Sequence, residues 1–149
     1  MARKRNHPGS TRQVYPRRLR GIRTRRGWTQ KRLAEELDRI AFPMNRATIA
    51  KIESGKRPME VSELVALATA LDVTPAALFL PLDPGSVALT DGVTVDAATA
   101  ATWVAGDAPL DAANAATYAL ESPKVHLELA MRMRSSGTVT PGPGRERGQ

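Results

Sequence analysis

The chain of 149 residues contains no cysteine, and this absence excludes disulfide bonds, thiolate metal sites and thiol nucleophiles. It is also typical of proteins in a reducing cytoplasm, which is the compartment we expect. Long apolar runs are absent too: none approaches the roughly 18 residues that a membrane-spanning helix needs, and the basic start has no apolar segment behind it. We therefore expect neither a signal peptide nor a membrane partner.

Groups suited to catalysis are scarce. The two histidines are His7, in a basic segment without apolar residues, and His126, which has no acid, base or metal partner in the surrounding pattern. No serine lies in a nucleophile-elbow motif, and the acidic residues of the second half are scattered. Because an enzyme needs positioned nucleophiles, acids or metal ligands, the sequence predicts a protein without catalytic activity, cofactor or metal.

Charge is distributed unevenly along the chain. The overall net charge is +7, but residues 1–57 hold 17 Lys or Arg and only four acids, a net charge of +13. The remainder holds five basic and 11 acidic residues, a net charge of −6. A basic segment of this kind is typical of nucleic-acid-binding proteins, so we expect the first third of the chain to meet a polyanion.

Composition divides the chain into four parts. Residues 1–15 are basic and almost free of apolar side chains, which predicts a flexible arm, and residues 16–81 carry helix-spaced apolar residues separated by Gly and Pro. Residues 82–134 predict a hairpin about Asp91-Gly92 followed by helices, whereas the Pro, Gly and Ser of residues 135–149 predict a disordered tail. The expected fold is mainly α: a five-helix domain with a small C-terminal α/β appendage.

Helix signals in residues 16–81 are specific. Pro16 favours the first turn of a short basic helix that Gly27 ends, and Thr29 is a good N-cap for a second helix that reaches about Arg39. After a connector broken by Pro43, we expect three more helices. The third has Asn45 as its N-cap and ends at Gly55, and the fifth follows Thr74 and Pro75. The fourth carries an apolar stripe of Val61, Leu64, Leu67, Ala68 and Leu71.

The second and third predicted helices have the layout of a helix-turn-helix unit, in which the second of the pair enters the DNA major groove. This third helix of the chain buries Ile49 and Ile52, so four side chains project outward. Arg46 suits guanine O6 and N7, and Ala47 or the Thr48 methyl group suits a thymine methyl group. The alternative interpretation is a merely solvated helix face. The outward set is Arg46, Ala47, Thr48 and Lys51.

Basic residues lie at the start of the second predicted helix, where the helix dipole favours acids. Lys31 and Arg32 in its first turn therefore indicate a DNA phosphate, bound by backbone N–H groups, by Lys31 and by the Gln30 amide. Lys56 and Arg57, just beyond the third helix, would hold phosphate on the other side. A solubilising charge cluster is the alternative.

The stretches WTQKRLAEEL, RATIAKIESGKR and VSELVALATALDVTPAALF resemble the phage repressor and Cro-like family of transcription regulators, often called XRE-like. The resemblance covers about residues 17–81. It implies a lambda-repressor-like domain that binds double-stranded DNA sequence-specifically, as a repressor and commonly as a homodimer on a palindrome. Because one monomer reads few base pairs, we expect two copies on half-sites about one helical turn apart.

The resemblance also assigns roles to single residues. It implies that Gln30 buttresses the recognition helix and touches phosphate, and that Arg23 pairs with Glu53 in a structural ion pair. The residues expected to read bases are Asn45, Arg46, Ala47, Thr48 and Lys51, and those expected to bind phosphate are Thr29, Gln30, Lys31, Ser54, Lys56 and Arg57.

The connector DRIAFPMN departs from the family pattern, because it is about five residues longer than the common short turn. The longer connector resembles that of regulators from actinobacteria. Phe42, Pro43 and Met44 replace the usual turn residues, and they either cover the core or offer a partner surface.

A second interpretation is an antitoxin or adaptor, in which residues 82–134 bind a protein partner and DNA binding is secondary. Trp103, Tyr118, Met131 and Met133 are the candidate contact residues. The alternative interpretation is that these residues form the small core of an appended subdomain.

Overall fold

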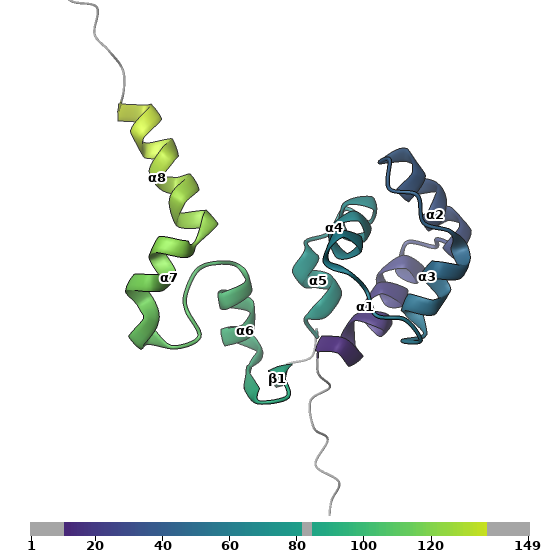
Figure 1. Cartoon of the computed structure of the whole chain (residues 1–149), viewed down its shortest axis with the longest axis horizontal. Helices are drawn as coiled ribbons and strands as arrows, with labels where there is room; N and C mark the ends of the chain where they lie inside the picture. The colour runs from purple at the N-terminus through teal and green to yellow at the C-terminus, as the bar shows by residue number, and fades with distance from the viewer. Residues whose placement is uncertain (1–10, 82–84, 137–149) are drawn as a thin grey trace, which may run out of the picture. The chain divides into compact units, whose positions relative to one another are not determined.

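The computed structural model describes residues 11–81 and 85–136. Within them the chain is mainly helical with one two-stranded sheet, which confirms the expected fold class. The chain divides into two compact units, Met1–Val104 and Ala105–Gln149, and Figure 1 labels their α-helices and the first strand. Residues 1–10 of the predicted arm and residues 137–149 of the predicted tail lie outside the described residues.

Five helices follow one another in the first part of the chain, as the sequence predicts. Three helices are capped as the sequence predicts, because the side chains of Thr29, Asn45 and Thr74 accept hydrogen bonds from the backbone N–H groups of Arg32, Thr48 and Ala77. The helices are α1 (Thr11–Arg25), α2 (Gln30–Arg39), α3 (Arg46–Glu53), α4 (Val61–Ala70) and α5 (Pro75–Phe79).

The first helix begins earlier than the sequence predicted. Pro16 was the expected start, but α1 already begins at Thr11. Val14 and Tyr15 are buried in it, and the Tyr15 hydroxyl donates a hydrogen bond to the backbone carbonyl of Arg57 at 3.4 Å. The buried surface and this distant bond offset the ordering entropy of the extra turn, so residues 11–15 belong to the helix.

Four helices end in the same way, with a residue in the left-handed region just beyond the helix. At the end of α2, the N–H of Ala41 bonds the Asp38 carbonyl and the N–H of Phe42 bonds the Leu37 carbonyl, each at 3.0 Å. This Schellman arrangement satisfies carbonyls that a helix end leaves without partners. The sequence predicted the two glycines but neither of the other two residues. The four residues and their φ angles are Gly27 (69°), Ala41 (57°), Gly55 (71°) and Asp72 (46°).

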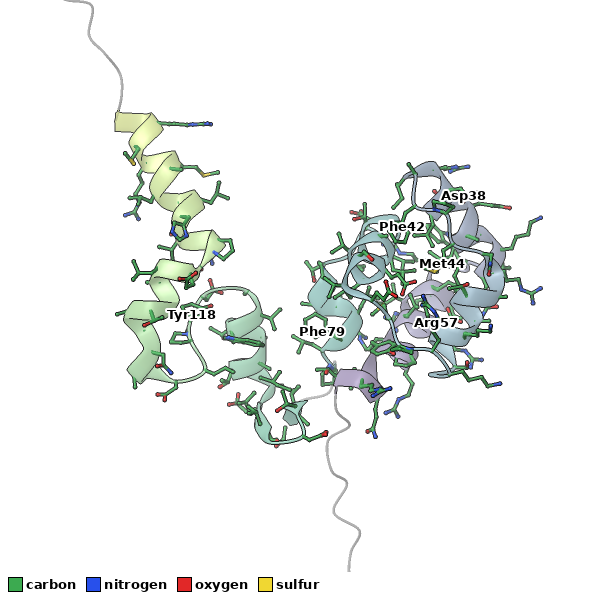
Figure 2. All side chains as sticks on the ribbon, in the orientation of Figure 1. Asp38, Phe42, Met44, Arg57, Phe79 and Tyr118 are labelled. Carbon is green, nitrogen blue, oxygen red and sulfur yellow. The ribbon has the colours of Figure 1, made fainter. Side chains whose placement is uncertain are left out.

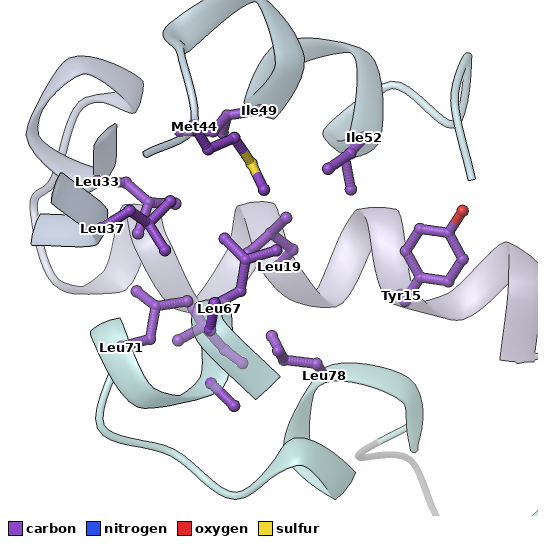
Figure 3. Packing of buried hydrophobic residues seen from close by; sticks show 13 residues of the cluster. Tyr15, Leu19, Leu33, Leu37, Met44, Ile49, Ile52, Leu67, Leu71 and Leu78 are labelled. Carbon is purple, nitrogen blue, oxygen red and sulfur yellow. The ribbon is translucent and has the colours of Figure 1, made fainter. Parts of the chain in front are cut away.

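The core lies between these five helices, and the long connector helps to cover it (Figure 3). Met44 is buried in the core and Phe42 packs against it, whereas Pro43 is exposed. The first of the two roles expected for the connector is therefore present. The buried members of the core are Tyr15, Leu19, Ile22, Leu33, Leu37, Met44, Ile49, Ile52, Ala66, Leu67, Ala68, Leu71 and Leu78.

The apolar stripe predicted for α4 is only partly buried. Leu67, Ala68 and Leu71 are buried, but Val61 is 79% exposed, so its place in the buried stripe was wrong. A step of three residues falls short of a full helical turn by about 60°. Two such steps separate Val61 from Leu67, and they move Val61 off the inner face.

Beyond the five helices, the predicted hairpin and helices are present. β1 (Ser86–Thr90) and β2 (Val93–Asp96) pair antiparallel around the Asp91-Gly92 turn. In the described part of the chain, no helix is both long and apolar enough to cross a membrane. The helical elements are α6 (Ala97–Val104) in the first unit, and the 3-10 helix η1 (Ala112–Asn114), α7 (Ala115–Glu121) and α8 (Pro123–Ser136) in the second.

Candidate nucleic-acid interface

Helix α3 carries the side chains expected to read bases, and its inner face is fully packed. Ile49 and Ile52 have no exposed surface. Asn45 Oδ1 accepts a hydrogen bond from the Thr48 backbone N–H at 2.8 Å, so the amide NH₂ group of Asn45 is left to donate elsewhere. On the outer side Arg46, Ala47 and Lys51 are exposed, and Thr48 is half-buried.

A buried ion pair holds α1 against α3. Arg23 Nε lies 2.6 Å from Glu53 Oε1, and Arg23 Nη2 donates to Glu53 Oε2 at 2.9 Å. Both residues are more than nine-tenths buried. The hydrogen bonds to the carboxylate raise the pKa of Arg23 above its ordinary value. These are the two residues that the family resemblance pairs.

Gln30 joins this ion pair to the start of α2. Its Nε2 donates to Glu53 Oε2 at 2.9 Å, and Arg23 Nη1 donates to the Trp28 carbonyl at 2.6 Å. The carboxylate of Glu53 therefore binds α1, the N-terminal end of α2 and the C-terminal end of α3 together. Since charge-assisted bidentate bonds are directional, this network of Arg23, Gln30 and Glu53 fixes the orientation of α3.

The start of α2 is exposed at Thr29 and Lys31. Thr29 Oγ1 accepts a hydrogen bond from the Arg32 backbone N–H at 3.1 Å. The first N–H groups of a helix have no acceptor within the helix, so those of Gln30 and Lys31 are suited to an anion. Arg32 is used differently, because its guanidinium pairs with the Glu36 carboxylate.

The turn after α3 separates the basic residues that were expected at phosphate. Lys56 is exposed, and so is Ser54, whose Oγ donates to the Lys51 carbonyl at 3.1 Å. Arg57, labelled in Figure 2, instead forms a bidentate ion pair with Glu63 of α4, at 2.8 and 2.7 Å. The sequence analysis identified neither this pair nor Glu63 as a residue of the site.

Glu63 is buried, and it links the turn to the start of α4. Its Oε2 also accepts a hydrogen bond from the Glu60 backbone N–H at 2.9 Å. The hydrogen bonds from Arg57 are the main cause that lowers the pKa of Glu63, and the same bonds raise the pKa of Arg57. The available sequence signal was a Glu at the third residue of the helix, the capping-box position. A phosphate that bound Arg57 would therefore have to share its guanidinium group with the Glu63 carboxylate.

Comparisons with known proteins identify the same segment. Residues 17–79 match a family model described as a helix-turn-helix domain. The restriction-modification controller protein C.AhdI from Aeromonas hydrophila is 33% identical, over 44% of this chain and 92% of its own, with a TM-score of 0.40. The hypothetical transcription factor NHTF from Neisseria is 26% identical, over 48% of this chain and 77% of its own, with a TM-score of 0.43. No curated protein matches the chain.

The matched segment runs from α1 to α5 and contains the whole Arg23, Gln30 and Glu53 network. The chain belongs to the phage repressor and Cro-like helix-turn-helix family. Proteins of this family are DNA-binding transcription regulators, so at this level the chain is a DNA-binding regulator. Helices α2 and α3 are the two helices of the motif that gives the helix-turn-helix domain its name.

The candidate contact residues outside the matched segment lie in different places. Trp103 lines a groove of the first unit together with Tyr15, Leu64 and other side chains of α1, α4, α5 and β1, and no residue of α2 or α3 contributes to this groove. In the second unit Tyr118 is half-buried, and Met131 and Met133 are exposed on α8. The groove is thus separate from the outer face of α3.

Metal-binding side chains are not gathered in the described ranges, where no group of three or more His, Asp or Glu could hold a metal ion. His126 lies on α8, with Nδ1 2.9 Å from the Ser122 carbonyl oxygen, and His7 lies outside the described residues.

Proposed function

We propose that the helix-turn-helix domain reads double-stranded DNA sequence-specifically through α3 in the major groove, and that it acts as a transcription repressor. One observation carries this proposal. The outer face of α3 presents Arg46, Ala47 and Lys51, while its inner face is held by Ile49, Ile52 and the Glu53 network. A helix is suited to distinguish base pairs when its inner face is fixed by packing and its outer face presents side chains of different chemistry.

Each residue on this face has a distinct role in the proposed readout. Arg46 forms a bidentate contact with guanine O6 and N7, and Ala47 and the Thr48 methyl group contact thymine methyl groups. The Asn45 amide donates to a base edge or a phosphate near the N-terminus of the helix. Lys51 supplies a flexible donor one turn later.

Phosphate contacts on both sides of α3 set its register. On one side are the first turn of α2, with Thr29 as its cap, and the side chains of Gln30 and Lys31. On the other side are Ser54 and Lys56 after α3. Arg57 adds positive charge there, although Glu63 neutralises part of it.

Two copies act together in this proposal. A single α3 covers only a few base pairs, so specific binding to an operator needs a homodimer on a pseudo-palindrome. The half-sites then lie one helical turn apart, about 10 base pairs from centre to centre. A footprint of the complex on the selected operator measures this spacing directly.

The test is a selection from a random DNA library with the wild type, followed by affinity against salt concentration for three variants. Arg46→Ala should relax the motif at one base pair and weaken binding by about 1 to 3 kcal/mol. Lys56→Ala should weaken binding to all sequences alike and lower the salt slope by about one. Arg134→Ala, which removes one positive charge outside the domain, is the matched control and should change neither.

Sequence-independent binding that follows net charge alone would contradict the proposal, and so would equal effects of Lys56→Ala and Arg134→Ala. An antitoxin or adaptor is the second candidate function. The observations that favour it are the Trp103 groove and the exposed apolar side chains of α8. A stable stoichiometric complex with another protein, together with weak and unselective DNA binding, would support it.

A further inference from the structure

Helix α1 (Thr11–Arg25) contains six arginines and no acidic residue. Two of the six make contacts within the protein. Arg23 pairs with Glu53, and Arg18 Nε donates to the Ala77 carbonyl at 2.9 Å. The other four are exposed, and none of them forms an ion pair with a residue in the described ranges; they are Arg12, Arg17, Arg20 and Arg25. The surface of α1 therefore carries positive charge that the described part of the chain does not neutralise.

The turn after α3, which carries the exposed Lys56, lies against the N-terminal half of α1. Pro16 Cγ of α1 is 3.8 Å from the position that a Cβ would take at Gly55. One residue earlier, the Tyr15 hydroxyl donates to the Arg57 carbonyl at 3.4 Å. The turn proposed to bind phosphate and the surface of α1 are therefore neighbours.

Helical geometry places Arg12 and Arg20 on the side of α1 that meets this turn. Each is four residues from Pro16, so each lies about one turn along the helix from Pro16 and within about 40° of it around the axis. Arg25 is nine residues from Pro16, which places it about 180° around the helix. Arg12 and Arg20 thus lie on the two sides of the contact with Gly55, whereas Arg25 points away from it.

A solvated helix is normally stabilised by opposite charges one turn apart, and α2 has such pairs. The guanidinium of Arg32 pairs with the carboxylate of Glu36 four residues later. On α1 the exposed neighbours Arg17 and Arg20 have the same charge, and like charges at helical spacing destabilise a helix. An anion from outside the chain would remove this repulsion, so the surface of α1 is suited to a polyanion.

We propose that α1 provides a second phosphate-binding surface, on which Arg12 and Arg20 contact the DNA backbone beside the base pairs that α3 reads. A guanidinium group binds phosphate through two parallel hydrogen bonds. The two arginines are about 12 Å apart along α1, and one strand of DNA has a phosphate for every 3.4 Å or so of its axis. Each arginine therefore meets a different phosphate.

This inference rests on the proposed function and deepens it. Contacts to the backbone carry no sequence information directly, but they raise the affinity and fix the position of the protein on the duplex. The surface of α1 would thus lengthen the stretch of DNA that one subunit contacts, without changing the motif that α3 selects.

The first experiment measures affinity against salt concentration for the full chain on a duplex of random sequence. Arg12→Ala and Arg20→Ala should each lower the salt slope by about 0.9, and the double variant by about 1.8. Arg25→Ala is the matched control, because it removes the same charge from an exposed position on the other side of the same helix. It should leave the slope unchanged. Replacing both Arg12 and Arg20 by lysine keeps the charge and should keep most of the slope.

Thermal unfolding followed by circular dichroism establishes that each variant is folded at the temperature of the binding measurement. The second experiment is phosphate ethylation interference on the selected operator. In the wild type, ethylation of phosphates outside the motif should block binding. Part of this interference should be lost on Arg20→Ala and retained on Arg25→Ala, while the selected motif stays the same in both variants.

Three results would overturn the inference: a salt slope that the double variant leaves unchanged, equal losses on Arg20→Ala and Arg25→Ala, or interference confined to phosphates within the motif. Failure of the proposed function would look different. The wild type would then select no motif, whereas the loss of salt slope on Arg12→Ala and Arg20→Ala would still be measured on the random duplex.

Discussion

The two units of the chain differ in how much of their leucine side chains they bury. In the helix-turn-helix domain Leu33, Leu37 and Leu67 have no exposed surface, whereas Leu127 and Leu129 of α8 are more than half exposed. Both sets lie in helices, so the sequence pattern that forms a helix does not by itself determine whether its apolar face is covered. The domain covers its leucines with its own helices, whereas Leu127 and Leu129 of α8 are left largely uncovered by the described residues.

Ion pairs sharpen this comparison, because each unit contains one that joins distant parts of the chain. The side chains of Arg23 and Glu53 are 8% and 3% exposed, while those of Lys124 and Asp107 are both 46% exposed. Arg23→Ala leaves the Glu53 carboxylate buried without its partner, and it should lower the free energy of unfolding by about 3 to 5 kcal/mol.

The matched change in the second unit is Lys124→Ala, which removes a solvated pair and should leave unfolding unchanged. Urea denaturation followed by tryptophan fluorescence and circular dichroism measures both variants. A loss of stability on Lys124→Ala as large as that on Arg23→Ala would contradict the contrast between the two units.

Acidification should destabilise the helix-turn-helix domain through protonation of Glu63, and the loss of stability should be smaller than that caused by Arg23→Ala. The hydrogen bonds from Arg57 lower the pKa of Glu63 in the folded state, so this carboxylate contributes stability above the ordinary glutamate pKa of about 4.3. The contribution is lost as the pH falls through the lowered pKa. Glu63→Gln should therefore be less stable than wild type at neutral pH, and the difference should shrink on acidification.

Thermal unfolding of both proteins between neutral pH and the acid limit of folding measures this difference. The helical signal of α7 and α8 provides the internal comparison, because Glu63 belongs to the other unit. A stability difference between wild type and Glu63→Gln that stays constant with pH would show that the pair contributes packing alone.

Substitutions at the helix ends of the domain should have the smallest effect on stability. Ala41 has a φ of 57° at the end of α2, a region that costs a residue with a Cβ free energy and costs glycine almost none. Ala41→Gly should therefore raise the free energy of unfolding by up to about 1 kcal/mol. Gly55→Ala, at a φ of 71° after α3, should have the opposite sign. Equilibrium denaturation distinguishes the two, and destabilisation by both would contradict the strain at Ala41.

Local signals made much of the domain predictable from the sequence. Thr29 and Asn45 cap helices through bonds to backbone three residues away, and Gly27 and Gly55 mark helix ends, so each signal lies within one turn of its effect. Ala41 and Asp72 end helices equally well, but neither is a glycine, and their positive φ angles are accompanied by hydrogen bonds from their own N–H groups to the Asp38 and Thr69 carbonyls of the preceding helices.

Contacts between distant residues were harder to predict. The family resemblance supplied the pairing of Arg23 with Glu53, which are 30 residues apart, and no local pattern indicates it. Arg57 was expected at phosphate because its charge alone is visible in the sequence, whereas its pairing with Glu63 depends on how the turn after α3 meets α4. The early start of α1 has the same origin, since Tyr15 bonds a carbonyl 42 residues later. The roles of single residues at DNA stay predictions.

The network around Glu53 has a consequence for fidelity. When a recognition helix becomes ordered only on binding DNA, the cost of ordering offsets part of the free energy of its contacts. A flexible recognition helix can also shift to accommodate a mismatched base pair. Here Arg23 and Gln30 hold the C-terminal end of α3 through contacts within the chain itself. In the proposed readout a wrong base would meet a helix that does not move aside, so the full cost of the lost contact would appear as discrimination between operators.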